Sequence, residues 1–210
     1  MHYFPIALPF LLLFALLLIF LVLLIEVGIL RYAYQRIGIG QRHMFLLLVL
    51  SFLGSYVNIP IYELPPHTVV AINVGGAIIP TLLSLYLIWK NRLYLRSFLG
   101  IGVVVVVVHA LAYPVKGVGI AEPVFVPPLI STMVALLLSR RYAPPLAYIS
   151  GSLGTLIGAD LLNLGKIQGL GAPVASIGGA GTFDGIFLTG ILSVLLVSLM
   201  TPREKPIDST

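Results

Sequence analysis

FLGIGVVVVVVHALAYPV, residues 98–115, is a run of eighteen residues without Asp, Glu, Lys or Arg. An apolar run of about this length is typical of a helix that crosses a lipid bilayer. The composition agrees, because 59% of the 210 residues are hydrophobic and only 9% are charged, whereas soluble domains are about one-quarter charged. The mean hydropathy is +1.10. The sequence therefore predicts an integral membrane protein.

The run at 98–115 is one of several apolar stretches separated by Pro, Gly and basic residues. The predicted spans are Ile6–Ile29, Phe45–Ile61, Val69–Trp89, Phe98–Val115, Val124–Ser139, Pro145–Leu164 and Phe183–Met200. The first is longer than the core of a signal peptide, so we expect it to be retained. The predicted fold is all-α: a polytopic transmembrane helical bundle of about seven spans that fills residues 1–200. Residues 201–210 form a polar tail that we expect to be cytoplasmic and disordered.

Basic residues indicate the orientation, because Lys and Arg concentrate in the cytoplasmic loops of membrane proteins. Ten of the twelve Lys and Arg fall in every second connection or in the tail: Arg31, Arg36, Arg42, Lys90, Arg92, Arg96, Arg140, Arg141, Arg203 and Lys205. The other connections hold only Lys116 and Lys166. This alternation predicts an N-terminus outside and a C-terminus inside the cytoplasmic membrane of a prokaryotic cell.

Several function classes are excluded at this stage. Without cysteine there is no thiol nucleophile, disulfide or Cys-ligated metal. No Walker or Rossmann motif is present, which argues against ATP and dinucleotide chemistry. The net charge of +5 is explained by the topology, so no nucleic-acid partner is expected. The expected partners are the lipid bilayer and a membrane-embedded peptide or small solute; no cofactor is expected, and the oligomeric state stays open.

Polar and ionisable residues gather in the predicted outer half of the membrane. They are Asn58, Glu63, His67, Asn73, His109, Glu122, Asp160, Asn163 and Asp184. A charged side chain inside a bilayer costs at least about 2.5–3.5 kcal/mol, so each such residue needs a reason. Most of the available chemistry is therefore expected near the outer leaflet.

The segment TVVAINVGGAIIP, residues 68–80, places Asn73, Gly75, Gly76 and Pro80 inside a predicted span. This combination is typical of an interrupted helix whose free backbone groups bind an ion or polar solute. It is equally typical of a close helix crossing built on small residues. Asn73, Gly75 and Gly76, together with His109 and Asn163, are therefore predicted ligand-binding residues, with the packing alternative left open.

Two aspartates belong to consecutive predicted spans. Asp160 follows a ridge of small residues at Gly151, Gly154 and Gly158, and a Gly-rich connection leads from there to Asp184. Two neighbouring carboxyls that share a proton can act as general acid and general base. Asp184 could instead simply cap the N-terminus of its helix. Asp160 and Asp184 are the predicted catalytic residues.

The segments GSYVNIPIYEL (54–64), VVAINVGGAIIP (69–80), GADLLNL (158–164) and GTFDGIFLTG (181–190) resemble an uncharacterised prokaryotic membrane family, domain of unknown function 1614. That resemblance implies no activity. ADLLNL (159–164) and GTFDGIF (181–187) also resemble the two motifs of presenilin and signal-peptide-peptidase type intramembrane aspartic proteases. In the second motif Phe183 stands where that class has Gly. This weaker resemblance implies catalytic roles for Asp160 and Asp184.

Three functions are compatible with this pattern, beside a purely structural or accessory role. The first is an intramembrane aspartic peptidase-like hydrolase that uses Asp160 and Asp184. The second is an ion- or proton-coupled transporter or channel, in which the same aspartates line a polar cavity with Asn73 and His109. The third is a metal-binding protein, since imidazole and carboxylate suit zinc or manganese. Its candidate ligands are Glu63, His67, His109, Glu122, Asp160 and Asp184.

Overall fold

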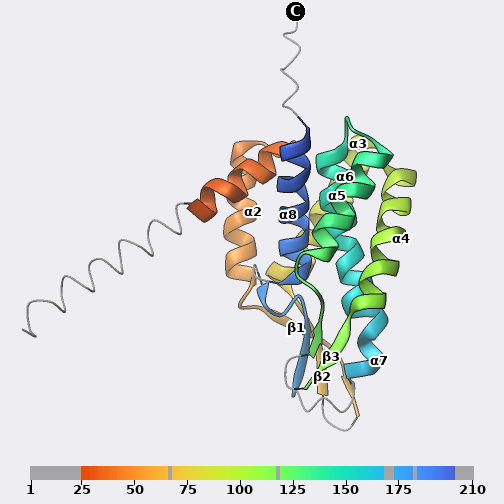
Figure 1. Ribbon diagram of the computed structural model, residues 1–210. Coiled ribbons are helices and arrows are strands. Elements are labelled where there is room, and N and C mark those ends of the chain that lie inside the picture. Colours follow the sequence, from red (N-terminus) through yellow and green to blue (C-terminus); the bar gives the residue numbers. More distant parts are fainter. Residues whose placement is uncertain (1–24, 66–67, 117–118, 168–172, 182–183, 202–210) are drawn as a thin grey trace, which may run out of the picture.

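The computed structural model describes residues 25–65, 68–116, 119–167, 173–181 and 184–201. Its helices are α2 Gln41–Gly54, α3 Ile79–Asn91, α4 Tyr94–Leu111, α5 Val126–Leu138, α6 Ala143–Thr155, α7 Leu164–Ile167 and α8 Gly185–Met200. Its strands are β1 Asn58–Leu64, β2 Thr68–Asn73, β3 Tyr113–Val115, β4 Gly119–Ala121 and β5 Val174–Ile177. The predicted helical bundle is confirmed, with small sheets added at one end (Figure 1).

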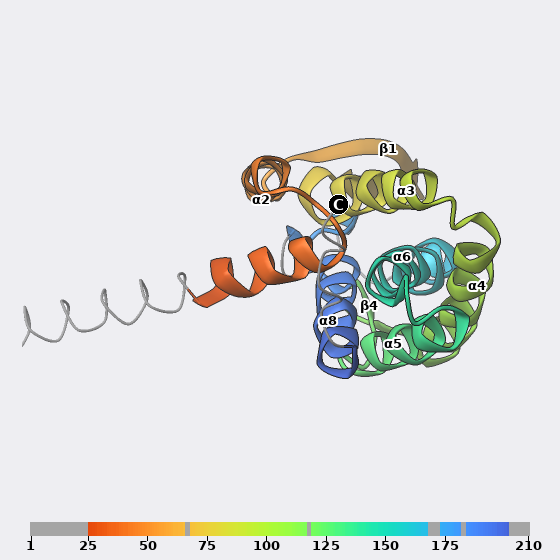
Figure 2. The ribbon, with the colours of Figure 1, turned by 90° about the horizontal axis from the view of Figure 1, so that it is seen from above.

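Helix α6 is the centre of the bundle. Seen from above, α3, α4, α5 and α8 surround it (Figure 2), and every one of its residues is buried. Small residues make this possible, because a Cβ on Gly151 would come within 2.9 Å of Ser193 Oγ on α8. Gly154 lies in the same way against Val104 of α4. The Gly-rich ridge therefore lets two neighbouring helices approach α6 closely.

Two short π-helical segments interrupt the helices. Val74–Ile78 leads from β2 into α3, and Leu156–Asp160 continues α6 before a 3₁₀ turn at Leu161–Asn163. π-Helical turns are rare and occur frequently at functional sites. Both lie at the end of the bundle that carries the strands (Figure 1).

The strands correct the expectation of an all-α fold. β1 pairs antiparallel with β2, β2 pairs parallel with β5, and β3 and β4 form a separate antiparallel pair. The predicted spans Phe45–Ile61 and Val69–Trp89 were therefore wrong at their junction, where residues 58–64 and 68–73 are strands. The predicted span Phe98–Val115 likewise ends in β3. Hydropathy alone cannot separate a short apolar strand from a continuing apolar helix, and these strands are rich in Ile and Val.

Within the described residues, two helical stretches are long and apolar enough to cross a membrane, Tyr94–Leu111 and Ala143–Ile167. The outward face of the bundle is also apolar. Phe98 on α4 is 75% exposed, Leu137 on α5 is 84% exposed, and Leu199 on α8 is 86% exposed. A soluble monomer rarely presents so many large apolar side chains on neighbouring helices. The structure thus has membrane-compatible helices with an apolar exterior.

Parts of the predicted first span and of the tail lie outside the described residues, namely 6–24 and 202–210. Residues 25–36 form a helix, which the view from above shows from its side, next to α2 and α8, so it is inclined to the long axis of the bundle (Figure 2). The count of seven spans and the orientation of the termini remain predictions.

Candidate functional site

Asp160 and Asp184 line the same cavity, which has a volume of about 370 Å³. Asp160 is the last residue of the π-helical turn that continues α6, and Asp184 directly precedes α8. The rest of the wall comes from Ile120 of β4, Ile167 of α7, β5 and the turn after β5. The structure therefore brings together the two predicted catalytic residues, although 23 other residues separate them in the chain.

The position of Asp160 follows from the packing of α6 against α4. A Cβ on Gly158 would come within 2.8 Å of the Val105 carbonyl oxygen and 3.0 Å of Val108 Cβ. Because Gly158 has no side chain, the π-helical turn lies directly on α4, and Asp160 stands two residues beyond that contact. Asp160 is half-buried there, at the edge of the cavity.

Asp184 also caps α8, as the alternative interpretation predicted. Its Oδ1 accepts a hydrogen bond from the Ile186 N–H at 3.0 Å, and Oδ2 accepts one from the Ala180 N–H at 3.4 Å. An N-cap carboxylate is stabilised by these donors and by the helix dipole. The two roles are compatible, because the side chain that caps α8 also borders the cavity.

A third carboxylate of this site is that of Glu122. From the sequence, Glu122 was predicted only as a candidate metal ligand. It lies in the connection between β4 and α5, and its Oε1 is so close to Gly185 that a Cβ there would be 2.7 Å away. Its Oε2 is buried and has no hydrogen-bond partner among the described residues. Burial, and next the charge of Asp184, raise the pKa of Glu122 to about 7.

The three carboxylates form a cluster, because Asp160 interacts electrostatically with both Asp184 and Glu122. None of the described residues that line the cavity is Lys or Arg. Like charges that interact in a partly buried space oppose one another's ionisation. The cluster is therefore expected to hold at least one proton at neutral pH and to titrate as a coupled group. We refer to Glu122, Asp160 and Asp184 as the carboxylate cluster.

Asn163 and His109 lie behind Asp160 rather than in the cavity wall. The buried Asn163 Nδ2 donates to the carbonyl oxygens of Gly158 and Ala159 at 2.8 and 2.9 Å. It also lies 3.2 Å from Nδ1 of His109 on α4. These bonds tie the Asn163 side chain to the backbone of the π-helical turn that carries Asp160. A direct ligand-binding role for either residue stays a prediction.

Asn73 lies inside its predicted span, at the change from β2 to the π-helical turn. The side chain is fully buried, and both its nitrogen and its oxygen are hydrogen-bonded. Nδ2 donates to the Ser55 carbonyl oxygen at 2.9 Å and to Asn58 Oδ1 at 3.0 Å. Oδ1 accepts from the Gly76 N–H at 2.8 Å. The Asn73 side chain thus joins the end of α2, β1 and the start of the π-helical turn.

Gly75 and Gly76 lie in close backbone contacts. A Cβ on Gly75 would come within 2.6 Å of Ser55 N, and one on Gly76 within 2.7 Å of the Gly181 carbonyl oxygen. This geometry is the one expected from the small-residue packing alternative. It also connects the π-helical turn to the segment between β5 and α8, which borders the cavity. Ligand binding by these glycines stays a prediction.

The described residues contain no preformed metal site. Within the described residues, no group of three or more His, Asp or Glu side chains is arranged so that it could hold a metal ion. Glu63 is exposed on β1, and His67 lies outside the described residues. His109 contacts Asn163 instead of the carboxylate cluster.

The fold and this cavity define a helical-bundle protein with a carboxylate site at its strand-bearing end. The chain belongs to the family described as protein of unknown function (DUF1614), which matches residues 20–196. The predicted resemblance to this family is therefore confirmed. No curated protein and no solved structure matches the chain, so the weaker resemblance to presenilin-type proteases gains no support.

Proposed function

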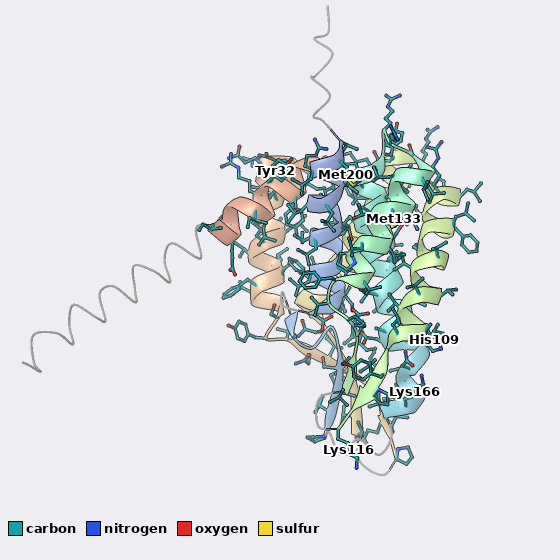
Figure 3. All side chains as sticks on the ribbon, viewed as in Figure 1. Tyr32, His109, Lys116, Met133, Lys166 and Met200 are labelled. Atoms are coloured by element: carbon teal, nitrogen blue, oxygen red, sulfur yellow. The ribbon has the colours of Figure 1, made fainter. Side chains whose placement is uncertain are left out.

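We propose that the chain is a multi-pass protein of the prokaryotic cytoplasmic membrane, with the carboxylate cluster on the outer side. The apolar exterior and the two membrane-compatible helical stretches support this proposal. The predicted outer residues His109, Lys116 and Lys166 lie toward the strand-bearing end, and Tyr32 and Met200 lie at the other end (Figure 3). The arginines of the α5–α6 connection also belong to that other end (Figure 1).

We propose further that the site is an aspartic hydrolase centre that cleaves a peptide bond. The observation that carries this proposal is that Asp160 and Asp184 line one cavity. Asp184 accepts hydrogen bonds from the backbone N–H groups of Ile186 and Ala180, and we assign it as the general base and Asp160 as the protonated general acid. Asp184 removes a proton from water, whose oxygen adds to the carbonyl carbon, while Asp160 donates its proton to the carbonyl oxygen.

In the second half of the reaction, Asp184 and Asp160 return to their starting protonation states. The tetrahedral adduct releases the amine when the C–N bond breaks, the nitrogen takes a proton from Asp184, and Asp160 regains its proton from the adduct. One water is consumed, and one carboxylic acid and one amine are formed. No external cofactor is needed for this balance.

Strand β5 supports a peptide as the substrate. It is the last strand of the order β1-β2-β5, and among the described strands it pairs only with β2. Its residues also form part of the cavity wall. An extended peptide can add to such a free edge through main-chain hydrogen bonds. A peptide bound along β5 would pass beside the carboxylate cluster.

The test uses the full chain in lipid nanodiscs and a defined set of single-span model peptides, with cleavage read by mass spectrometry. Asp160→Asn and Asp184→Asn should each abolish cleavage, and the second variant keeps its helix cap because Asn caps well. Glu63→Gln, on exposed β1 at the same end, is the matched control and should cleave like the wild type. Undiminished cleavage by Asp160→Asn would contradict the proposal.

The carboxylate cluster also favours a second candidate, a proton-coupled transporter. Its specific support is Glu122, whose pKa near 7 would allow proton uptake and release at physiological pH. Proton flux into proteoliposomes, followed with an internal pH-sensitive dye at a fixed membrane voltage, separates the two candidates. Flux that is lost in both Glu122→Gln and Asp160→Asn, with no peptide cleavage in the wild type, would favour transport over hydrolysis.

A further inference from the structure

A second polar cavity, of about 700 Å³, opens at the end of the bundle opposite the carboxylate cluster. Three arginines from distant parts of the chain line it: Arg36 from the helix at 25–36, and Arg140 and Arg141 from the connection between α5 and α6. None of the described residues in its wall is Asp or Glu. The cavity therefore concentrates positive charge that no carboxylate in its wall neutralises. We call it the arginine cavity.

Two of the three arginines make defined contacts. Arg36 Nε donates to Ser198 Oγ at 2.9 Å, and its Nη2 donates to both the carbonyl and the hydroxyl oxygen of Thr201 at 2.8 Å. These acceptors are neutral, so the charge of Arg36 stays uncompensated by them. The Arg141 guanidinium lies 5.5 Å from the ring centre of Tyr142, in a cation–π contact. A group of guanidinium ions of this kind, with Arg36 held in place by its hydrogen bonds, suits a phosphate.

An apolar cavity of about 560 Å³ adjoins the arginine cavity, because Gly38 lines both. It lies between α2 and α3, and its wall is mainly Leu and Ile side chains, among them Leu46, Leu50 and Leu82. Lys90 also lines it, and its Nζ donates to the Gly38 carbonyl oxygen at 2.7 Å. A cationic pocket and an apolar groove thus meet at one residue.

We propose that these two cavities bind one anionic diacyl phospholipid, with the headgroup phosphate on Arg36, Arg140 and Arg141 and an acyl chain between α2 and α3. Basic pockets between helices on the cytoplasmic side of a membrane are suited to anionic headgroups. The apolar groove distinguishes a lipid from a free phosphate, which would leave it unfilled. This inference shares the membrane location with the proposed function and does not depend on the carboxylate cluster.

The experiment measures binding to the full chain, purified in a neutral detergent, by native mass spectrometry and by thermal shift. Phosphatidylglycerol should bind as a single discrete copy and raise the apparent Tm, because a ligand that binds only the folded state stabilises it. Phosphatidylcholine should bind at least about tenfold more weakly, since it carries no net negative charge. The Arg140→Gln/Arg141→Gln double variant should lose about tenfold or more in affinity for phosphatidylglycerol.

Matched controls separate the lipid site from general electrostatics and from the hydrolase proposal. Arg96→Gln removes an exposed positive charge on α4 outside both cavities, and should bind phosphatidylglycerol like the wild type. Asp160→Asn should also bind it normally. Equal binding by the double variant and the wild type would overturn the proposal. Inorganic phosphate that gives the full thermal shift alone would overturn the lipid as the occupant.

Discussion

At the residue scale, Glu122 shows how position determines chemistry. In the sequence it is one acidic residue in a connection, but in the fold its Oε1 lies against Gly185 at the start of α8 and its Oε2 is buried. Burial and the charge of Asp184 raise its pKa from 4.5 to about 7. In the folded state Glu122 therefore keeps its proton over a pH range in which the unfolded chain has lost it.

This difference in protonation between the folded and the unfolded state predicts that the free energy of unfolding depends on pH. Between about pH 4.5 and pH 7 the folded state binds more protons than the unfolded state, so the free energy of unfolding falls as the pH rises through this window. The loss is on the order of 3 kcal/mol, at 1.36 kcal/mol per pKa unit. Glu122→Gln should remove the part of this dependence that comes from Glu122 and leave the part that comes from the other two carboxylates, which thermal unfolding in detergent at pH 5 and pH 8 would measure.

The control for this prediction is Glu63→Gln, at an exposed position on β1. That variant should keep the pH dependence of the wild type, because the Glu63 side chain is exposed and does not line the cavity of the carboxylate cluster. If Glu122→Gln and the wild type lose the same stability between pH 5 and pH 8, then Glu122 does not contribute to the pH dependence.

At the element scale, the π-helical turn Val74–Ile78 is held by close contacts that only glycine permits. Gly76→Ala should destabilise the protein by about 1–3 kcal/mol, because the new Cβ would meet the backbone carbonyls of Gly178 and Gly181, which cannot move aside like a flexible side chain. Gly102→Ala in α4 is the matched control, since nothing lies within 4 Å of its Cβ position. It should keep or slightly raise the stability.

Apparent Tm values of the two glycine variants in the same detergent test this expectation. A Gly76→Ala protein as stable as Gly102→Ala would show that the contact with the segment after β5 does not exist in solution. Because that segment borders the cavity, Gly76→Ala should also lower any activity of the carboxylate cluster, whereas Gly102→Ala should not.

At the scale of the whole molecule, the prediction to test is the orientation. The chain has no cysteine, so single cysteines can be introduced into an otherwise unreactive background. Lys116→Cys, at the exposed turn after β3, should react with a membrane-impermeant maleimide in intact cells. Arg141→Cys, exposed between α5 and α6, should react only after the membrane is permeabilised. The reverse pattern would contradict an N-terminus outside.

Much of the bundle could be predicted from the sequence. The predicted spans Val124–Ser139 and Phe183–Met200 agree closely with α5 and α8 in their described parts, because apolar composition acts locally on each helix. The strands at 58–64 and 68–73 could not be predicted in the same way. Their pairing depends on residues distant in the chain, as in the parallel pairing of β2 with β5, and an apolar run carries no signal for that partner.

The candidate site was predicted in part. The position of Asp160 and Asp184 on consecutive predicted spans indicated a common depth, and the fold places both on one cavity. Glu122 could not be assigned to them, because it reaches the site through the packing of the β4–α5 connection against the start of α8. The hydrogen bonds of the Asn73 side chain could not be predicted either, because two of its partners lie at the end of α2 and on β1.

The sequence by itself determined an apolar helical chain and the identity of its few ionisable groups, because hydropathy and composition are properties of each segment alone. Only the tertiary structure decided which of those groups meet. Interactions between charges depend on distance through space and on burial, and both are set by how α6, α8 and the strands pack. For this reason three carboxylates share one end of the bundle while the arginines line a cavity at the other.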